Sequence, residues 1–494
     1  MLKRTALLLS LAAGLTGAAV AQKYQGTWES IDSRPTPGWF SDAKFGIFIH
    51  WGVYSVPAFA PVGNYSEWYW NALMAGPTDK KGNPNLTLQF HNRVYGPSFP
   101  YFDFAPMFRA EVYDPAHWAD VFERSGAKYV VLTSKHHDGY ALWPSEHASR
   151  AWNRPWNSVE IGPKRDLLGD LTTEVRKRGV RMGFYYSLYE WYNPLWLADR
   201  KRYVVEHMHP QFKDVVTRYK PSLIFSDGEW DMPSEDWKSP ELLAWLFNES
   251  PSRDEVVIDD RWGKDSRHKH GGYFTTEYTA GLENASRPWE ECRGMGHSFG
   301  YNRMEQLKDY RSARELILMV IDLTSRGGNL LLDIGPTADG RIPIIMEERL
   351  TQIGQWLKVN GEAIYGTRPW RKTRQFSAGK APELKTGEFM TKYEVTDYVD
   401  RKSADQAVIE AFFTTKGGDL YAIVPGWPGR TLTVKEVAPS KSTAVTMLGQ
   451  AGTLKWKRSG QNVVITMPEI PADRAKAAYA YTLKLTGLGA AAAR

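Results

Sequence analysis

The chain has 494 residues, more than the roughly 250–300 at which a single hydrophobic core stops growing, so we expect two domains. The formal net charge is only +6, and basic and acidic residues are interspersed along the chain, which argues against a nucleic-acid-binding protein. A single cysteine, Cys292, excludes an internal disulfide.

Residues 1–21 have the pattern of a secretory signal peptide. Lys3 and Arg4 precede an apolar run, and the segment closes with small residues at 19–21. We therefore expect cleavage before Gln22 and an exported protein, periplasmic or secreted. No other segment has the ~18 consecutive apolar residues of a membrane span, so no membrane association is expected after cleavage.

Short apolar runs alternate with amphipathic helical patterns between about residues 44 and 365. This alternation is typical of βα units around a parallel sheet. The strand candidates are residues 45–50, 129–134, 181–187, 223–226, 256–259, 272–276, 289–293 and 329–334. They predict an α/β fold with a (β/α)8-like, TIM-type barrel over residues 22–365.

Helices are predicted between these runs from their capping residues. Examples are residues 114–124, 166–178, 199–219 and 312–325. After residue 366, alternating strands at 419–424, 431–434, 443–448 and 463–467 lie between glycine-rich turns. They predict a C-terminal antiparallel β-sandwich over residues 366–494.

Asp227 follows the apolar run 223–226 and precedes Gly228. Residues at the carboxyl ends of barrel strands line the active site, so Asp227 is a candidate nucleophile. An Asp-Gly pair is also a common turn, and by itself the motif does not separate the two interpretations.

Other strand ends carry polar and aromatic residues suited to binding a sugar. The candidates are His50, Glu67, Trp68, His136, His137 and Tyr186. A second carboxylate, Glu290, lies beside Trp289, where an apolar environment would raise its pKa as a general acid requires. Two carboxyl groups about 5–5.5 Å apart would make a retaining glycosidase. Asp259, Asp260 and Arg261 are expected to lock the barrel rim through ion pairs.

Adjacent His136 and His137 also allow a metal site. Side chains alternate along a strand, so adjacent histidines converge only where the strand breaks. No second cluster of His or Cys completes a ligand set. We therefore expect no metal and no cofactor, and keep a metal-dependent barrel hydrolase as an alternative.

Several motifs occur together in a fixed order. They are residues 45–52 (FGIFIHWG), 67–69 (EWY), 135–139 (KHHDG), 184–187 (FYYS), 227–230 (DGEW), 289–290 (WE) with Cys292, and 335–336 (GP) followed by 339–340 (DG). In this order the chain resembles the α-L-fucosidases of glycoside hydrolase family 29 over nearly all of the mature sequence.

The resemblance implies a retaining exo-α-L-fucosidase that acts on fucosylated oligosaccharides or glycoconjugates without a metal. It implies that Asp227 is the nucleophile, that Glu290 is the acid/base, and that the six residues named above bind the fucosyl ring. Asp333 and Asp259 stand where the family often has asparagine. A catalytically silent glycan-binding protein is a further alternative, and a homo-oligomer remains open.

Overall fold

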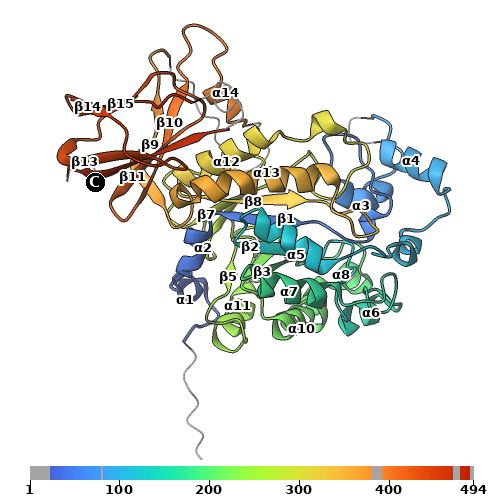
Figure 1. The fold of residues 1–494 in the computed structure, drawn as a ribbon. Helices are drawn as coiled ribbons and strands as arrows, with labels where there is room; N and C mark the ends of the chain where they lie inside the picture. Colours follow the sequence, from blue (N-terminus) through green and yellow to red (C-terminus); the bar gives the residue numbers. More distant parts are fainter. Residues whose placement is uncertain (1–22, 79–81, 381–390, 392, 471–478, 490–494) are drawn as a thin grey trace, which may run out of the picture.

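The computed structural model describes residues 23–78, 82–380, 391, 393–470 and 479–489, and it has two parts (Figure 1). The larger part is a curved parallel sheet surrounded by helices, and the smaller part consists of antiparallel strands at one end of the molecule. The expected signal peptide, residues 1–21, lies outside the described residues. No helix in the described ranges combines the length and the hydropathy that crossing a bilayer requires.

Eight parallel strands form the sheet of the larger part, in the order β5-β4-β3-β2-β1-β8-β7-β6. Their bounds are β1 Phe45–Ile49, β2 Tyr129–Lys135, β3 Arg181–Ser187, β4 Leu223–Asp227, β5 Val257–Ile258, β6 Phe274–Glu277, β7 Trp289–Gly294 and β8 Asn329–Ile334. The first strand pairs with both the second and the last, as in a TIM barrel. The predicted fold class is confirmed.

The barrel has one irregular seam, between β5 and β6. The backbone amides of Gly272 and Tyr273 cross it, donating to the carbonyl of Ile258 at 3.1 and 3.2 Å. Since β5 contains two residues, it is too short to form a ladder with β6. The loop after β5 therefore enters the barrel mouth at this seam.

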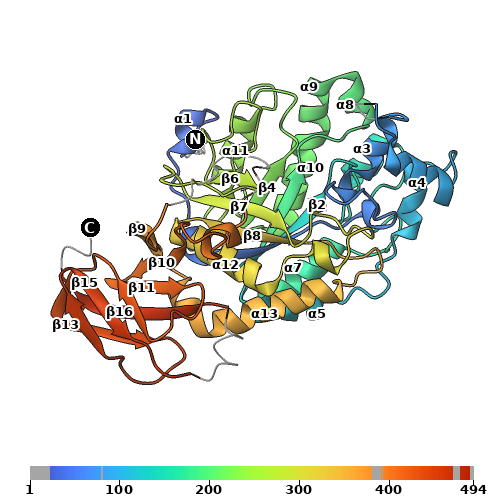
Figure 2. The ribbon, with the colours of Figure 1, turned by 90° about the horizontal axis from the view of Figure 1, so that it is seen from above.

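The strands are buried on both faces, which explains why their sequences are continuous apolar runs and do not alternate. Helices cover the outside of the sheet (Figures 1 and 2). Those of the larger part are α1 Trp28–Asp32, α2 Gly38–Ala43, α3 Tyr69–Met74, α4 Leu86–Val94, α5 Pro115–Arg124, α6 Glu146–Trp152, α7 Leu167–Lys177, α8 Pro194–Ala198, α9 Arg200–Tyr203, α10 His209–Tyr219, α11 Ser239–Asn248, α12 Ala313–Ser325 and α13 Ile344–Asn360.

The predicted helix 199–219 is present without a break but includes a π-helical turn. It consists of α9, a π-helical turn over Val204–Met208, and α10. Pro210 lies in the first turn of α10 and has no backbone N–H to donate, so the regular helical hydrogen-bond pattern cannot pass through this point. The prediction of a helix over these residues is confirmed, and Pro210 accounts for the change in its hydrogen-bond pattern.

The smaller part contains a five-stranded sheet, β13-β16-β11-β10-β9, and a three-stranded sheet, β12-β15-β14, both antiparallel. The bounds are β9 Arg368–Phe376, β10 Ile409–Lys416, β11 Asp419–Val424, β12 Thr431–Val434, β13 Pro439–Met447, β14 Trp456–Ser459, β15 Asn462–Thr466 and β16 Tyr481–Leu488, with the short helix α14 Thr396–Val399. Side chains from both sheets share one core, including Phe413, Leu483, Val434 and Ile465. This is the arrangement of the predicted β-sandwich.

The five-stranded sheet packs against α12 and α13 (Figure 2). Arg374 of β9 lies with its Nε 3.3 Å from Oδ1 of Asp322 in α12. Trp356 of α13 donates from Nε1 to the carbonyl of Ala480 at 3.0 Å. Since both contacts are on the helical outer layer, this part of the chain buttresses the side of the barrel.

The contact between α13 and α5 leaves no room for a side chain at Gly354. A Cβ added there would lie 1.9 Å from the backbone oxygen of Arg124. We expect Gly354→Val to lower the free energy of unfolding by about 1–3 kcal/mol through overpacking. Urea unfolding followed by tryptophan fluorescence measures the change.

Gly426→Val is the matched control, because an added Cβ at Gly426 meets no atom within 4 Å. We expect this control to change the free energy of unfolding by less than about 0.5 kcal/mol. Equal losses in the two variants would contradict the packing argument.

Candidate active site

A cavity of about 410 Å³ opens at the carboxyl ends of the barrel strands. It is lined by Phe48, His50, Tyr65, Glu67, Trp68, His136, Tyr185, Phe225, Asp227, Trp230, Arg261, Arg267, Glu277, Cys292 and Phe299. All of these residues belong to the barrel. Within the described ranges, the C-terminal sheets contribute no residue to this cavity.

Asp227 is the last residue of β4 and lines the cavity. Its Oδ2 accepts a hydrogen bond from the Tyr185 hydroxyl at 2.8 Å, and its Oδ1 accepts one from Arg261 Nη1 at 3.0 Å. Burial would raise the pKa of Asp227, but attraction to the neighbouring guanidinium groups outweighs it and holds this pKa below its ordinary value. Asp227 is therefore an ionised carboxylate at neutral pH.

The turn after Asp227 requires a glycine. Gly228 has φ +77°, and an added Cβ would lie 2.4 Å from Cδ1 of Tyr189. A side chain here would be strained and would also collide with the ring of Tyr189. Gly228 thus allows the chain to leave β4 abruptly with the Asp227 carboxylate facing the cavity.

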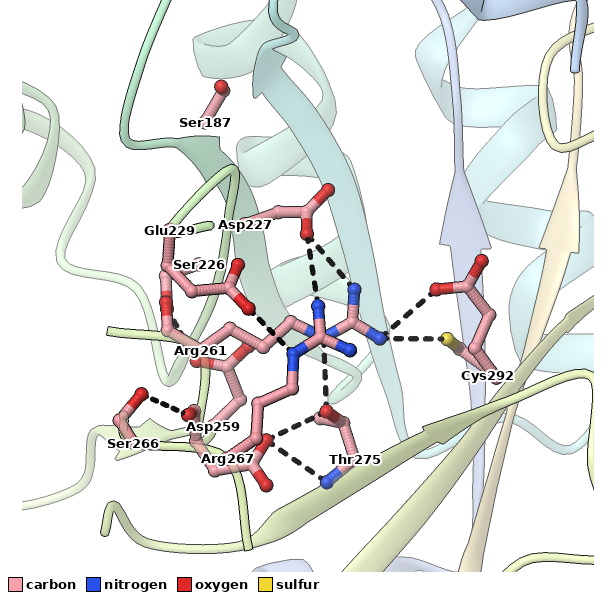
Figure 3. A network of polar contacts seen from close by, with 12 residues as sticks. Ser187, Ser226, Asp227, Glu229, Asp259, Arg261, Ser266, Arg267, Thr275 and Cys292 are labelled. Atoms are coloured by element: carbon pink, nitrogen blue, oxygen red, sulfur yellow. Dashed lines mark hydrogen bonds and ion pairs between the residues drawn. The ribbon is translucent and has the colours of Figure 1, made fainter. Parts of the chain in front are cut away.

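Arg261 lies at the centre of the polar network and is almost completely buried (Figure 3). Besides Asp227, it donates from Nη2 to Glu277 Oε2 at 3.1 Å, and from Nε to Thr275 Oγ1 at 3.0 Å. Arg261 does not form the predicted lock at the rim; it lines the cavity and joins two of its carboxylates.

Two aspartates that precede Arg261 fix the loop that carries it. Asp259 accepts a hydrogen bond from Ser226 at 2.6 Å, and Asp260 accepts one from the hydroxyl of Thr275 at 2.7 Å. These bonds tie the loop to β4 and β6, across the irregular seam of the barrel. The guanidinium position is thus determined by the barrel framework.

Arg267 provides a second positive charge beside Asp227 (Figure 3). Its Nη2 lies 4.0 Å from Asp227 Oδ1, and its Nε donates to Oε1 of Glu229 at 2.6 Å. Unlike Arg261, it is partly exposed to solvent at the mouth of the cavity.

Glu277 is the last residue of β6 and the carboxylate that the sequence analysis missed. It lines the cavity and accepts a hydrogen bond from the Tyr65 hydroxyl at 2.9 Å. It directly follows the predicted strand 272–276, so its position at a strand end was a usable signal. However, Glu277 is not followed by a glycine, whereas Asp227 is followed by Gly228.

Glu290 lies elsewhere. It is fully buried in β7, paired in register with Asn329, the first residue of β8, and its carboxylate accepts a hydrogen bond from Tyr129. Burial raises the pKa of Glu290 to about 8, as the sequence analysis anticipated. However, Glu290 does not line the cavity, because it sits two residues below Cys292 toward the amino-terminal end of the barrel. The prediction that it faces the substrate is corrected.

Tyr186 also points away from the cavity. Its hydroxyl donates to Gln211 at 2.9 Å, on the helical side of β3. Tyr185 occupies the inward position, with its hydroxyl on Asp227. Side chains alternate along a strand, so only one of two adjacent tyrosines can face the cavity. The prediction selected the tyrosine that faces the helices.

Three histidines converge near Asp227. His50 and His136 line the cavity, and Nε2 of His137 lies 3.5 Å from Asp227 Oδ2. Burial lowers the pKa of all three histidines well below the ordinary value. They are therefore neutral, and His50 and His136 can each present a donor or an acceptor to a ligand hydroxyl. His137 is not among the residues that line the cavity.

Two of these rings are fixed from behind. Nδ1 of His50 is 2.7 Å from Oδ1 of Asp333, and Nδ1 of His137 is 2.6 Å from the Ser187 hydroxyl. Asp333, one of the two departures from the family pattern, is thus the residue that orients His50. The other departure, Asp259, accepts the hydrogen bond from Ser226 that holds the loop carrying Arg261.

Glu67 and Trp68 form one wall of the cavity. Glu67 accepts a hydrogen bond from the Gly300 amide at 2.9 Å, and burial raises its pKa to about 7. Trp68 stacks against Trp230, with ring centroids 5.9 Å apart, and Trp230 is 37% exposed at the mouth. The cavity thus combines polar groups with aromatic faces, as sugar-binding sites do.

Among the described residues, no group of three or more His, Cys, Asp or Glu side chains is arranged to hold a metal ion. Adjacent His136 and His137 do converge, since β2 ends at Lys135 and the strand alternation stops there. No further ligand joins them in this part of the chain.

Known proteins resemble this chain along nearly its whole length. The α-L-fucosidase family model matches residues 12–362, and the α-L-fucosidase C-terminal domain model matches residues 404–486. Tissue α-L-fucosidase of Homo sapiens is 40% identical, over 98% of this chain and 96% of that protein. α-L-Fucosidase of Dictyostelium discoideum is 48% identical, over 71% of this chain and 76% of that protein.

A solved structure agrees with these matches. The structure of Thermotoga maritima α-fucosidase with a mechanism-based inhibitor superposes with a TM-score of 0.74 at 33% identity, covering 94% of this chain and 100% of that one. The sequence matches, the fold and the cavity with its two bridged carboxylates lead to the same conclusion. The chain belongs to the α-L-fucosidase family and is a glycoside hydrolase.

Proposed function

We propose that the chain is a retaining exo-α-L-fucosidase that releases terminal α-L-fucosyl residues from glycans through a covalent glycosyl-enzyme intermediate. The observation that carries this proposal is the contact of one buried guanidinium, that of Arg261, with both Asp227 and Glu277. A retaining glycosidase needs two carboxyl groups about 5–5.5 Å apart, and a shared guanidinium holds two carboxylates at close range.

Asp227 is the proposed nucleophile. It is ionised, and the short turn at Gly228 presents it to the cavity. Its oxygen forms a bond to the anomeric carbon as the bond from that carbon to the leaving oxygen breaks. Glu277 gives its proton to the leaving oxygen in the same step.

In the second step Glu277 takes a proton from the water that attacks the anomeric carbon, and the ester bond to Asp227 breaks. Two inversions give net retention. Once Asp227 is a neutral ester, Arg261 keeps Glu277 as its remaining carboxylate partner in the cavity.

The sugar ring itself is proposed to be bound by His50, Glu67, Trp68, His136 and His137. The neutral imidazoles of His50 and His136 and the Glu67 carboxyl supply hydrogen bonds to hydroxyl groups, and Trp68, against which His137 packs, supplies an aromatic face. The cavity of about 410 Å³ is closed by the barrel core below, where Phe48 and Phe225 lie. A terminal residue can enter such a site, which supports exo action.

Export is also proposed, on the basis of the charged, apolar and small-residue pattern of residues 1–21. An amino-terminal sequence starting at Gln22 in protein recovered outside the cytoplasm would support it.

Asp227→Gly tests the nucleophile. We expect kcat/KM for an aryl α-L-fucoside to fall by at least about 10³-fold, because no other group can form the glycosyl ester. Proton NMR of the wild-type reaction should show α-fucose as the first product. The control is Asp254→Gly, at an exposed aspartate outside the cavity, which should retain activity. Near-normal rates in folded Asp227→Gly would refute the assignment.

Azide rescue identifies the acid/base. In Glu277→Ala, hydrolysis of an activated aryl fucoside should stall at the glycosyl-enzyme, and azide should restore turnover and yield α-L-fucosyl azide. Azide carries its own negative charge and needs no base. The product is followed by NMR.

Two other glutamates serve as comparisons for this experiment. Glu290→Gln keeps a hydrogen-bonding group beside Tyr129, outside the cavity, and should retain most of the activity without a response to azide. Glu67→Gln should raise KM, also without azide rescue. An azide response in either of these variants, and none in Glu277→Ala, would move the acid/base role.

Arg267→Gln tests the electrostatic control of Asp227. Activity needs the ionised form of Asp227, whose pKa the two guanidinium groups hold down against burial. Removing one of them raises this pKa, so the acidic limb of the pH profile of kcat/KM should move to higher pH. The basic limb should stay in place. An unchanged acidic limb would show that Arg267 does not act on the ionisation that limits the rate.

A further inference from the structure

A second hollow, of about 550 Å³, adjoins the catalytic cavity. Tyr65 and Trp68 line both of them, so these two aromatic side chains form a shared rim. The far side of the hollow is formed by α3 and by the chain that leads into α4. We call it the α3 groove.

Two side-chain amides in the α3 groove are available to a ligand. Asn64 and Asn71 line it, and their side chains form no hydrogen bond within the described part of the chain. Asn85 differs, because its side chain caps α4 and donates to the carbonyls of Ala72 and Gly76. The groove thus has both free donors and free acceptors, with small residues such as Ala72 and Ala75 between them.

No charged side chain occurs among the described residues that line the α3 groove. Among these described residues, a phosphate or an acidic sugar would find no counter-ion. Amides, an aromatic face and small apolar side chains are instead suited to a neutral saccharide, whose hydroxyls pair with amides and whose C–H faces pack on rings.

The path of the substrate leads to the same place. The catalytic cavity is closed toward the barrel core, so the part of the glycan beyond the fucosyl unit has to leave through the mouth, which Trp68 borders. The α3 groove begins on the other side of Trp68. We propose that the α3 groove binds neutral sugar units of the leaving glycan, with Asn64 and Asn71 as hydrogen-bonding residues. This inference rests on the proposed function.

The test compares two substrates, an aryl α-L-fucoside and a neutral trisaccharide with terminal α-L-fucose on a disaccharide. In the double variant Asn64→Ala/Asn71→Ala, kcat/KM for the trisaccharide should fall about tenfold, as expected for two lost neutral hydrogen bonds. The loss should be mainly in KM. The aryl fucoside, which has no sugar in the groove, should change less than about twofold.

Ala75→Trp fills the groove while leaving Asn64 and Asn71 in the sequence, and it should give the same selective loss. Asn92→Ala is the matched control, since Asn92 is an exposed asparagine of α4 outside the groove, and it should leave both substrates unaffected.

Equal effects on both substrates, or no effect on the trisaccharide, would overturn the inference. So would a wild-type enzyme that hydrolyses the aryl fucoside but neither hydrolyses the trisaccharide nor is inhibited by it. Absence of aryl fucoside hydrolysis by the wild type would instead refute the proposed function.

Discussion

The buried guanidinium of Arg261 is the interaction on which the active site depends. Burying a charge costs free energy unless the charge is paired and hydrogen-bonded. The planar guanidinium of Arg261 donates hydrogen bonds to both Asp227 and Glu277. In turn, two buried carboxylates facing one cavity would repel each other without a cation between them. The three groups therefore stabilise one another and set the spacing on which the proposed chemistry relies.

The irregularity of the barrel makes this arrangement possible. In a regular barrel, β5 and β6 would form a ladder, and the chain between them would cross the outside as a helix. Here β5 ends after two residues, and the loop that follows carries Arg261 into the mouth. Hydrogen bonds from Ser226 and Thr275 to Asp259 and Asp260 replace the missing ladder as the support for this loop.

Glu290 and Tyr186 show why plausible residues can be wrong. Burial raises the pKa of Glu290 to about 8, the shift expected of a general acid, but a buried carboxyl in the barrel core shows the same shift without access to any substrate. Tyr186 is adjacent to the tyrosine that contacts Asp227. Neither depth along a barrel strand nor the direction of a side chain can be obtained from the local sequence.

The sequence by itself determined the positions of the barrel strands to within about two residues, the antiparallel C-terminal part, and the role of strand ends as the place where polar groups gather. These features depend on local hydrophobic patterns and turn residues. The clearest example is Asp227, which was identified from the apolar strand before it and from Gly228 after it. The tertiary structure alone decided which carboxylate accompanies Asp227. The register between β6, β7 and β8 places Glu277 beside Cys292 in the cavity and Glu290 beside Asn329 in the core. Register is a property of neighbouring strands far apart in sequence, so no single segment encodes it.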